Sequence, residues 1–156
     1  MRKGIVMMIE LAKCEKGHVR RGFLAVLALT CAGAAACARP AADMDLSLNR
    51  TTDDKLFRVR AASETNPIPM SKMHRWSLHV DSADGLPVTG ARLEIDGGMP
   101  EHGHGLPTAP RAEPGDAPGD YVINGMKFSM PGWWVLKVNV QAPNGRTDKV
   151  TFNVVL

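Results

Sequence analysis

Apolar and polar side chains alternate along most of the chain after residue 55. In the clearest run, Trp76, Leu78 and Val80 are separated by single polar residues, and similar runs begin near residues 57, 91, 134 and 150. A period of two predicts β-strands that bury one face, because successive side chains of a strand point to opposite sides. By this parity we expect a core that contains Trp76, Leu78, Leu93, Ile95, Trp134, Leu136, Val138, Phe152 and Val154.

Short turn sequences separate the apolar runs and contain glycine, which accepts a positive φ. They are Asp84-Gly85, Asn124-Gly125, Pro131-Gly132 and Asn144-Gly145. After residue 37 no segment shows the 3.6-residue period of an amphipathic helix. Six or seven short strands at this spacing predict an all-β fold, an immunoglobulin-like antiparallel β-sandwich. The Cys…Trp…Cys spacing of antibody domains is missing, so the likeness concerns architecture alone.

The segment 97–119 breaks this rhythm. It contains six Gly and five Pro in 23 residues, which is incompatible with a central strand. We therefore expect a long loop, and loops of this length in compact domains are usually functional or disordered.

The N-terminal part of the chain has the features of an export signal. Arg20-Arg21 precede an apolar run from Phe23 to Leu29, and small residues continue to Ala36. Three alanines then precede Cys37, which resembles a bacterial lipobox. We expect cleavage before Cys37 and a lipid on its thiol. An ordinary secretory signal without lipid is the alternative, and the route of export stays open.

This leader divides the chain into three expected parts: a signal peptide over 1–37, a flexible tether over 38–54 and a β-sandwich domain over 55–156. The polar composition of the middle part is typical of a linker. Such a protein would lie on the periplasmic side of a bacterial cell envelope, attached to the membrane through its lipid anchor.

Charge and cysteine are both concentrated in the leader. The whole chain carries +3, but residues 1–37 hold six basic and two acidic side chains, and the rest holds thirteen basic and fourteen acidic. The domain is therefore near neutral and has no basic face for nucleic acid. All three cysteines lie within the first 37 residues, which excludes a disulfide or a thiolate metal site inside the domain.

Potential metal ligands gather at the start of the Gly- and Pro-rich segment, which reads Met99-Pro100-Glu101-His102-Gly103-His104-Gly105. Imidazole binds many transition metals, and thioether sulfur favours the soft Cu(I) ion. Met130, at a Pro-Gly turn, is a further candidate, whereas Met126 and His74 are weaker ones. The competing interpretations are a polar surface loop, a methionine that fills a core gap and a hydrogen-bonded rim histidine.

Catalytic arrangements do not stand out in the sequence. It shows no Ser/His/Asp, Cys/His or paired-carboxylate pattern, and Glu101 with His102 and His104 lacks the H-E-x-x-H spacing of metalloproteases. We therefore expect a protein that is not an enzyme.

Two stretches together resemble the YtkA-like domain family, which is related to the FixH-like proteins of bacterial oxidase assembly. They are His74 to Thr108, with its M-P-E-H-G-H-G sequence, and Tyr121 to Trp134, with its F-S-M-P-G-W-W sequence. The resemblance covers residues 55–156 and implies an exported or membrane-tethered sandwich that handles copper or supports respiratory copper enzymes. It places copper ligands on Met99, His102, His104 and Met130, and less clearly on Met126 and His74. FixH-like proteins have an N-terminal membrane helix, where this chain has the lipobox-like Cys37.

Two functions are thus predicted. In the first, the protein carries copper or helps to insert it, and its partner is an envelope copper protein or an oxidase assembly factor. In the second, it is a metal-free envelope interaction module that docks a partner through the loop 97–119. Convergence of Met and His side chains would favour the first function, and divergence over an apolar patch the second.

Overall fold

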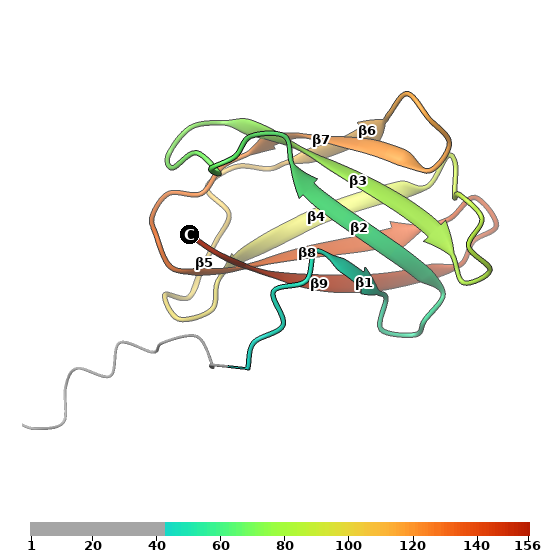
Figure 1. The fold of residues 1–156 in the computed structure, drawn as a ribbon, viewed down its shortest axis with the longest axis horizontal. Helices are drawn as coiled ribbons and strands as arrows, with labels where there is room; N and C mark the ends of the chain where they lie inside the picture. Colours follow the sequence, from blue (N-terminus) through green and yellow to red (C-terminus); the bar gives the residue numbers. More distant parts are fainter. Residues whose placement is uncertain (1–42) are drawn as a thin grey trace, which may run out of the picture. The chain divides into compact units, whose positions relative to one another are not determined.

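The computed structural model describes residues 43–156, which form nine strands in two antiparallel sheets (Figure 1). The first sheet has the order β1 (Asn49–Thr51), β2 (Phe57–Ser63), β3 (His74–Ser82), β7 (Asp120–Met126) and β6 (Arg111–Pro114). The second has the order β5 (His104–Gly105), β4 (Arg92–Met99), β8 (Trp133–Gln141) and β9 (Thr147–Val155). The predicted antiparallel β-sandwich is confirmed. The predicted signal peptide, its cleavage site and the lipid on Cys37 lie outside the described residues.

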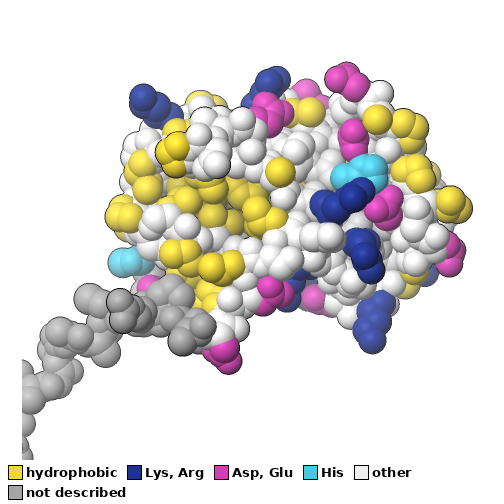
Figure 2. Space-filling view, viewed as in Figure 1, with side chains coloured by type: hydrophobic (Ala, Val, Ile, Leu, Met, Phe, Trp, Pro, Cys, Tyr) yellow, Lys and Arg dark blue, Asp and Glu magenta, His cyan; other side chains and the backbone are white. Residues whose placement is uncertain are grey.

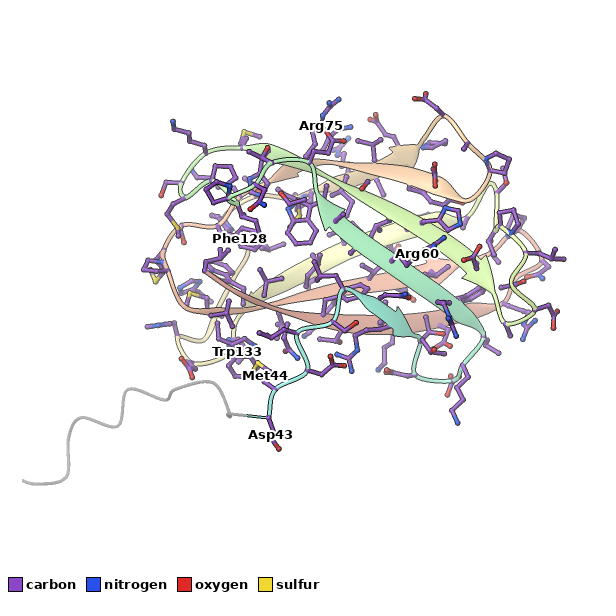
Figure 3. All side chains as sticks on the ribbon, in the orientation of Figure 1. Asp43, Met44, Arg60, Arg75, Phe128 and Trp133 are labelled. Atoms are coloured by element: carbon purple, nitrogen blue, oxygen red, sulfur yellow. The ribbon has the colours of Figure 1, made fainter. Side chains whose placement is uncertain are left out.

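The core between the sheets follows the predicted parity. Trp134 is fully buried and Trp133 is partly exposed, so the expected register of β8 is confirmed. In Figure 3, Phe128 lies between the two sheets and Trp133 lies on the outer surface. Ile95 was expected in the core but is only partly buried, because the middle of β4 lies at the rim of its sheet, where β5 pairs only with Gly98 and Met99. The other eight expected core residues are buried.

Gly125 does not form the turn that the Asn124-Gly125 pair predicted. Instead β7 continues through it to Met126. The register against β3 changes there, because Trp76 pairs with Ile123 whereas His74 pairs with Met126. Between these two pairs, Arg75 of β3 therefore faces two residues of β7, Asn124 and Gly125, and Gly125 has a φ of 85°. This β-bulge shifts the inward parity of β7 by one position.

The segment 97–119 is not the single long loop that its Gly and Pro content predicted. It contains the end of β4, all of β5 and all of β6. Gly97 allows β4 to lie close to β8, because a Cβ there would lie 2.3 Å from the carbonyl oxygen of Val135 in that strand.

β1 lies within the segment 38–54 that was expected to be a tether. Residues 43–156 include no helix of a length and apolarity that could cross a membrane.

Candidate metal centre

Three connections between strands meet at one end of the sandwich, on the left in Figure 1. They are the β2–β3 loop with Met70 and Met73, the β4–β5 turn with His102, and the β7–β8 loop with Phe128 and Met130. The antiparallel order of the strands accounts for this arrangement, because alternate connections return to the same end of a sandwich. The end therefore carries most of the residues that the sequence proposed as metal ligands.

The two histidines of the β4–β5 turn lie next to each other. The backbone N–H groups of His102 and Gly103 both donate to the carbonyl oxygen of Met99, at 3.1 and 3.0 Å, and Gly103 closes the turn with a φ of 66°. The rings of His102 and His104 then stack with centroids 5.9 Å apart and planes inclined by 30°. Both side chains are exposed. Nδ1–H of His104 donates to the Gly105 carbonyl oxygen at 3.2 Å, which leaves Nε2 as a free lone pair.

Met99 belongs to the core and not to the loop where the sequence placed it. It is 1% exposed at the end of β4. Its methyl carbon Cε fills the space beside Gly132, since a Cβ on Gly132 would lie 2.8 Å from it. Met99 therefore lies against the Pro131-Gly132 turn that follows Met130.

Trp134 connects the histidine turn to the methionine loop. Its indole Nε1–H donates to the carbonyl oxygen of Met130 at 3.0 Å, and the ring of His104 lies 5.7 Å from its ring, edge to face. The side chain of Met130 is 37% exposed. Trp134 thus links His104 to the backbone of Met130, while Met99 lies against the turn that follows Met130. Among residues 43–156 no group of three or more His, Cys, Asp or Glu could hold a metal ion, so a site here depends on thioether ligands.

The two weaker candidates, His74 and Met126, lie deeper at the same end. They face each other across β3 and β7, and both are buried. A continuous row of aromatic rings separates them from the surface histidines. The ring of Phe128 lies 5.6 Å from that of His74 and 5.2 Å from that of Trp134. His74 and Met126 therefore do not join His102 and His104 in a single cluster.

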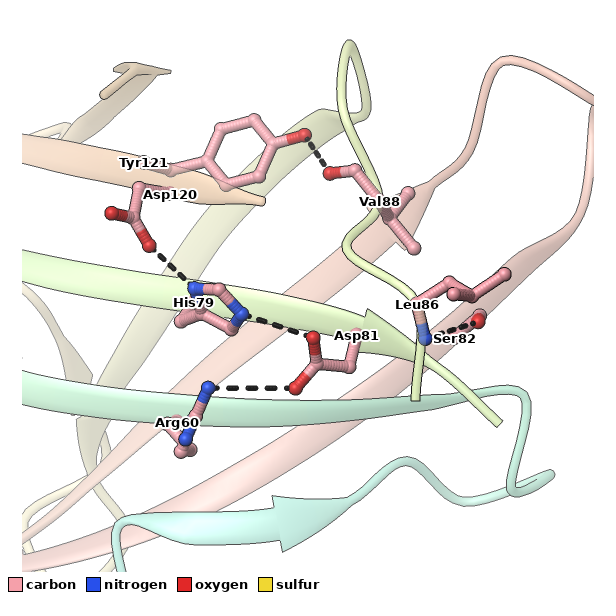
Figure 4. A network of polar contacts seen from close by, with 8 residues as sticks. All are labelled: Arg60, His79, Asp81, Ser82, Leu86, Val88, Asp120 and Tyr121. Atoms are coloured by element: carbon pink, nitrogen blue, oxygen red, sulfur yellow. Dashed lines mark hydrogen bonds and ion pairs between the residues drawn. The ribbon is translucent and has the colours of Figure 1, made fainter. Parts of the chain in front are cut away.

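His79, on the polar face of β3, is the centre of an ionic network (Figure 4). Its Nδ1–H donates to a carboxylate oxygen of Asp120 and its Nε2–H to one of Asp81 at 3.0 Å, while Arg60 lies 3.5 Å from Asp81. The hydrogen bond to Asp120 is the main cause that raises the pKa of His79, against an opposing effect of burial. With both nitrogens donating, this ring has no lone pair for a metal.

The contact of His79 with Asp81 could have been predicted from the sequence, since residues i and i+2 of a strand share a face. Asp120 could not, because it is 41 positions away and reaches His79 only through the pairing of β3 with β7.

A strip of apolar side chains is exposed on the face shown in Figure 2, toward the same end of the molecule. A shallow groove there is lined by Leu46, Leu48, Ile68, Asn153, Val154 and Val155. Leu46 and Val155 are the most exposed of them.

These observations define a two-sheet β-sandwich with histidine and methionine residues gathered at one end. The model of the YtkA-like family matches residues 54–139, more than half of the chain, and the chain belongs to this family. A solved DUF4426 family protein from Pseudomonas aeruginosa is 13% identical, with a TM-score of 0.52 over 70% of this chain and 94% of that one. This likeness shows the fold alone. The ZirS C-terminal domain is 10% identical with a TM-score of 0.37, covering 100% of this chain and 88% of that one. No curated protein sequence matches the chain.

Proposed function

We propose that this protein binds copper in the bacterial cell envelope and acts as a carrier or accessory for respiratory copper enzymes, without catalysing a reaction itself. The observation that supports this most directly is the stacked pair of His102 and His104, exposed on a tight turn that follows Met99. Solvent-exposed imidazoles with a free nitrogen can bind a metal without rearrangement of the core.

The chemistry of the neighbourhood favours copper over the harder ions. Two imidazoles and two thioethers form a neutral, soft ligand set, and thioether prefers Cu(I) to Zn²⁺, Mg²⁺ or Ca²⁺. His102, His104 and Met130 are all accessible, and Met99 lies buried behind them. Such an incompletely enclosed set would release an ion by exchange of ligands with a partner site. That property suits a carrier better than a permanent cofactor site.

The proposed setting is the periplasmic face of a membrane, with the protein attached by a lipid on Cys37. The partner would be an envelope copper protein or an oxidase assembly factor. A short attachment of this kind would restrict the copper-binding end of the sandwich to a layer near membrane-bound enzymes. Neither nucleic acid nor a small-molecule substrate has a place in this proposal.

Competition with a Cu(I) chelator at fixed pH tests the proposal. Replacement of both His102 and His104 by Ala should weaken Cu(I) binding by about a hundredfold or more, since loss of even an outer-shell group costs tenfold or more. The fold should persist, because both side chains are exposed. His79→Gln is the matched control, since it removes one imidazole that has no free lone pair. Equal affinity in the wild type and the double variant would contradict a copper site on this pair, and a lack of Cu(I) binding by both proteins would favour the metal-free docking module.

A further inference from the structure

His74 contains a nitrogen that the fold leaves without a partner. Its Nδ1 lies 3.1 Å from the carbonyl oxygen of Lys72, and because a carbonyl only accepts hydrogen bonds, Nδ1 must carry the proton. Nε2 is then the bare lone pair. It is buried, and among the residues that the structure describes it has no hydrogen-bond partner. The whole residue is only 8% exposed.

This arrangement is the one that metal-binding histidines commonly have. A backbone carbonyl that holds one ring N–H fixes both the tautomer and the orientation of the ring, and it makes the other nitrogen a better ligand. An unpartnered acceptor buried in an apolar core is otherwise unfavourable, because it has lost its hydrogen bonds to water. The geometry of His74 therefore indicates that Nε2 binds a metal ion or accepts a hydrogen bond from a group outside the chain.

The β-bulge at Gly125 brings a sulfur ligand to the same place. Tyr121 and Ile123 point inward along β7, and unbroken alternation would turn Gly125 inward next. Because the bulge adds one residue, Met126 takes the inward position directly opposite His74. Side chains in such a cross-strand pair have Cβ atoms about 5 Å apart. A fully buried thioether thus lies beside the fixed imidazole.

The β2–β3 loop brings a second methionine next to Phe128. Met70 forms an isolated bridge with Phe128, whose ring lies against His74. The N–H of Ser71 donates to the Phe128 carbonyl oxygen at 2.7 Å, and its hydroxyl donates to the Ser129 carbonyl oxygen at 3.1 Å. Ser71 itself has a φ of 57°, which is unfavourable for a residue other than glycine. Met70 is 37% exposed, so it is accessible to solvent.

We infer that Nε2 of His74, with the thioethers of Met126 and Met70, forms a second binding site for Cu(I), distinct from the surface pair His102 and His104. The set is neutral and soft, contains no carboxylate or thiolate, and so discriminates against Zn²⁺, Mg²⁺ and Ca²⁺. The inference extends the proposed function and shares its metal but none of its ligands. The rings of Phe128 and Trp134 keep the two sites apart.

Nitrogen NMR of the histidine rings tests this inference on the purified protein carrying His102→Ala and His104→Ala. Without metal, His74 should show the neutral tautomer with its proton on Nδ1. One equivalent of Cu(I) should shift the Nε2 resonance of His74 and leave that of His79 unchanged. A site confined to the surface pair would give no shift in this variant, so failure of the proposed function and failure of this inference have different signatures.

A methionine substitution gives a second readout that does not depend on removing the buried ring. In the same double variant, Met126→Leu conserves volume but removes the sulfur, so the fold should persist. Chelator competition should show Cu(I) binding weakened by about tenfold or more. Met44→Leu is the matched control, since Met44 lies at the start of the described chain, away from Phe128 (Figure 3).

Two results would overturn the inference. One is a His74 Nε2 resonance that Cu(I) does not shift. The other is equal Cu(I) affinity with and without Met126→Leu. Either result would favour a buried water molecule in place of the metal. That water would donate to Nε2 of His74 and accept from Nε1–H of Trp76, the other buried polar atom that lacks a partner within residues 43–156.

Discussion

At the scale of single residues, the fold gives three histidines three different chemical states. His104 has a free lone pair at the surface, His74 has one in the core, and His79 has none. In each case the partner of the other ring nitrogen decides the state. A backbone carbonyl that accepts from one ring nitrogen leaves the other nitrogen without a partner, whereas the two carboxylates around His79 favour the imidazolium ion.

His79 gives the domain a pH-dependent stability with a defined sign. Its pKa is raised in the folded state, mainly by the hydrogen bond to Asp120, from an ordinary value of 6.5. The stabilisation is therefore fully present below pH 6.5 and is lost as the pH rises through the folded pKa. His79→Gln should lower the free energy of unfolding by about 1 kcal/mol at acidic pH and by much less at pH 9.

Urea unfolding of both proteins at several pH values measures this difference. Asp120→Asn serves as the matched variant, because it removes the main cause of the shift while keeping the ring. A loss of stability in His79→Gln that is the same at all pH values would indicate a packing role and contradict the ionic one.

At the scale of strands, glycines decide how closely β4 approaches its neighbours. A Cβ on Gly97 would lie 2.3 Å from the Val135 carbonyl oxygen, and one on Gly98 would lie 2.3 Å from that of His104. These two positions fix β4 between β8 and the histidine turn. The glycines that argued against a strand in this segment are thus the residues that allow one.

Gly97→Ala should consequently separate β4 from β8 and destabilise the domain by about 2 kcal/mol or more, as overpacking does. Gly105→Ala is the matched control, because a Cβ there would meet its nearest neighbour, the Gly97 carbonyl oxygen, at an ordinary 3.5 Å. Chemical denaturation of the two variants and the wild type gives the comparison. Similar stabilities of the two variants would show that the strands can shift without cost.

At the scale of the whole molecule, the sandwich separates the end that carries the candidate metal ligands from an ionic face. The connections that carry His102, Met130 and Met70 lie at one end, while His79 with its carboxylates lies on the outer face of the first sheet. The apolar groove of Leu46 and Val155 lies toward the end with the candidate ligands. A carrier anchored at its N-terminus would present these features to a membrane-bound partner.

The location of the protein can be tested through its mature N-terminus. We expect the chain to start at Cys37 with a lipid on that residue, because an export signal and a cysteine after three alanines coincide. Mass spectrometry of protein extracted from membranes should show the added acyl mass. Cys37→Ser should release the protein into the soluble fraction. Soluble wild-type protein with an unmodified start at Ala38 or later would contradict the anchor.

The sequence by itself determined most of the long strands and the core residues that alternate along them. Alternation is a local property, so it specifies which face of each strand is buried wherever the pleat is regular, as in β3 and β8. It also indicated the family and the candidate ligands, since both depend on short stretches of residues. It overestimated burial only at Ile95, where the position of β4 at a rim matters more than parity.

Only the tertiary structure decided the environment of each ligand. The bulge that turns Met126 toward His74 arises from pairing with another strand, and the burial of Met99 arises from the turn at Gly132. The strands within 97–119 and the bond between His79 and Asp120 have the same origin. These are contacts between residues far apart in the chain. A local pattern carries no information about them, because the partner is supplied by the packing of the sheets.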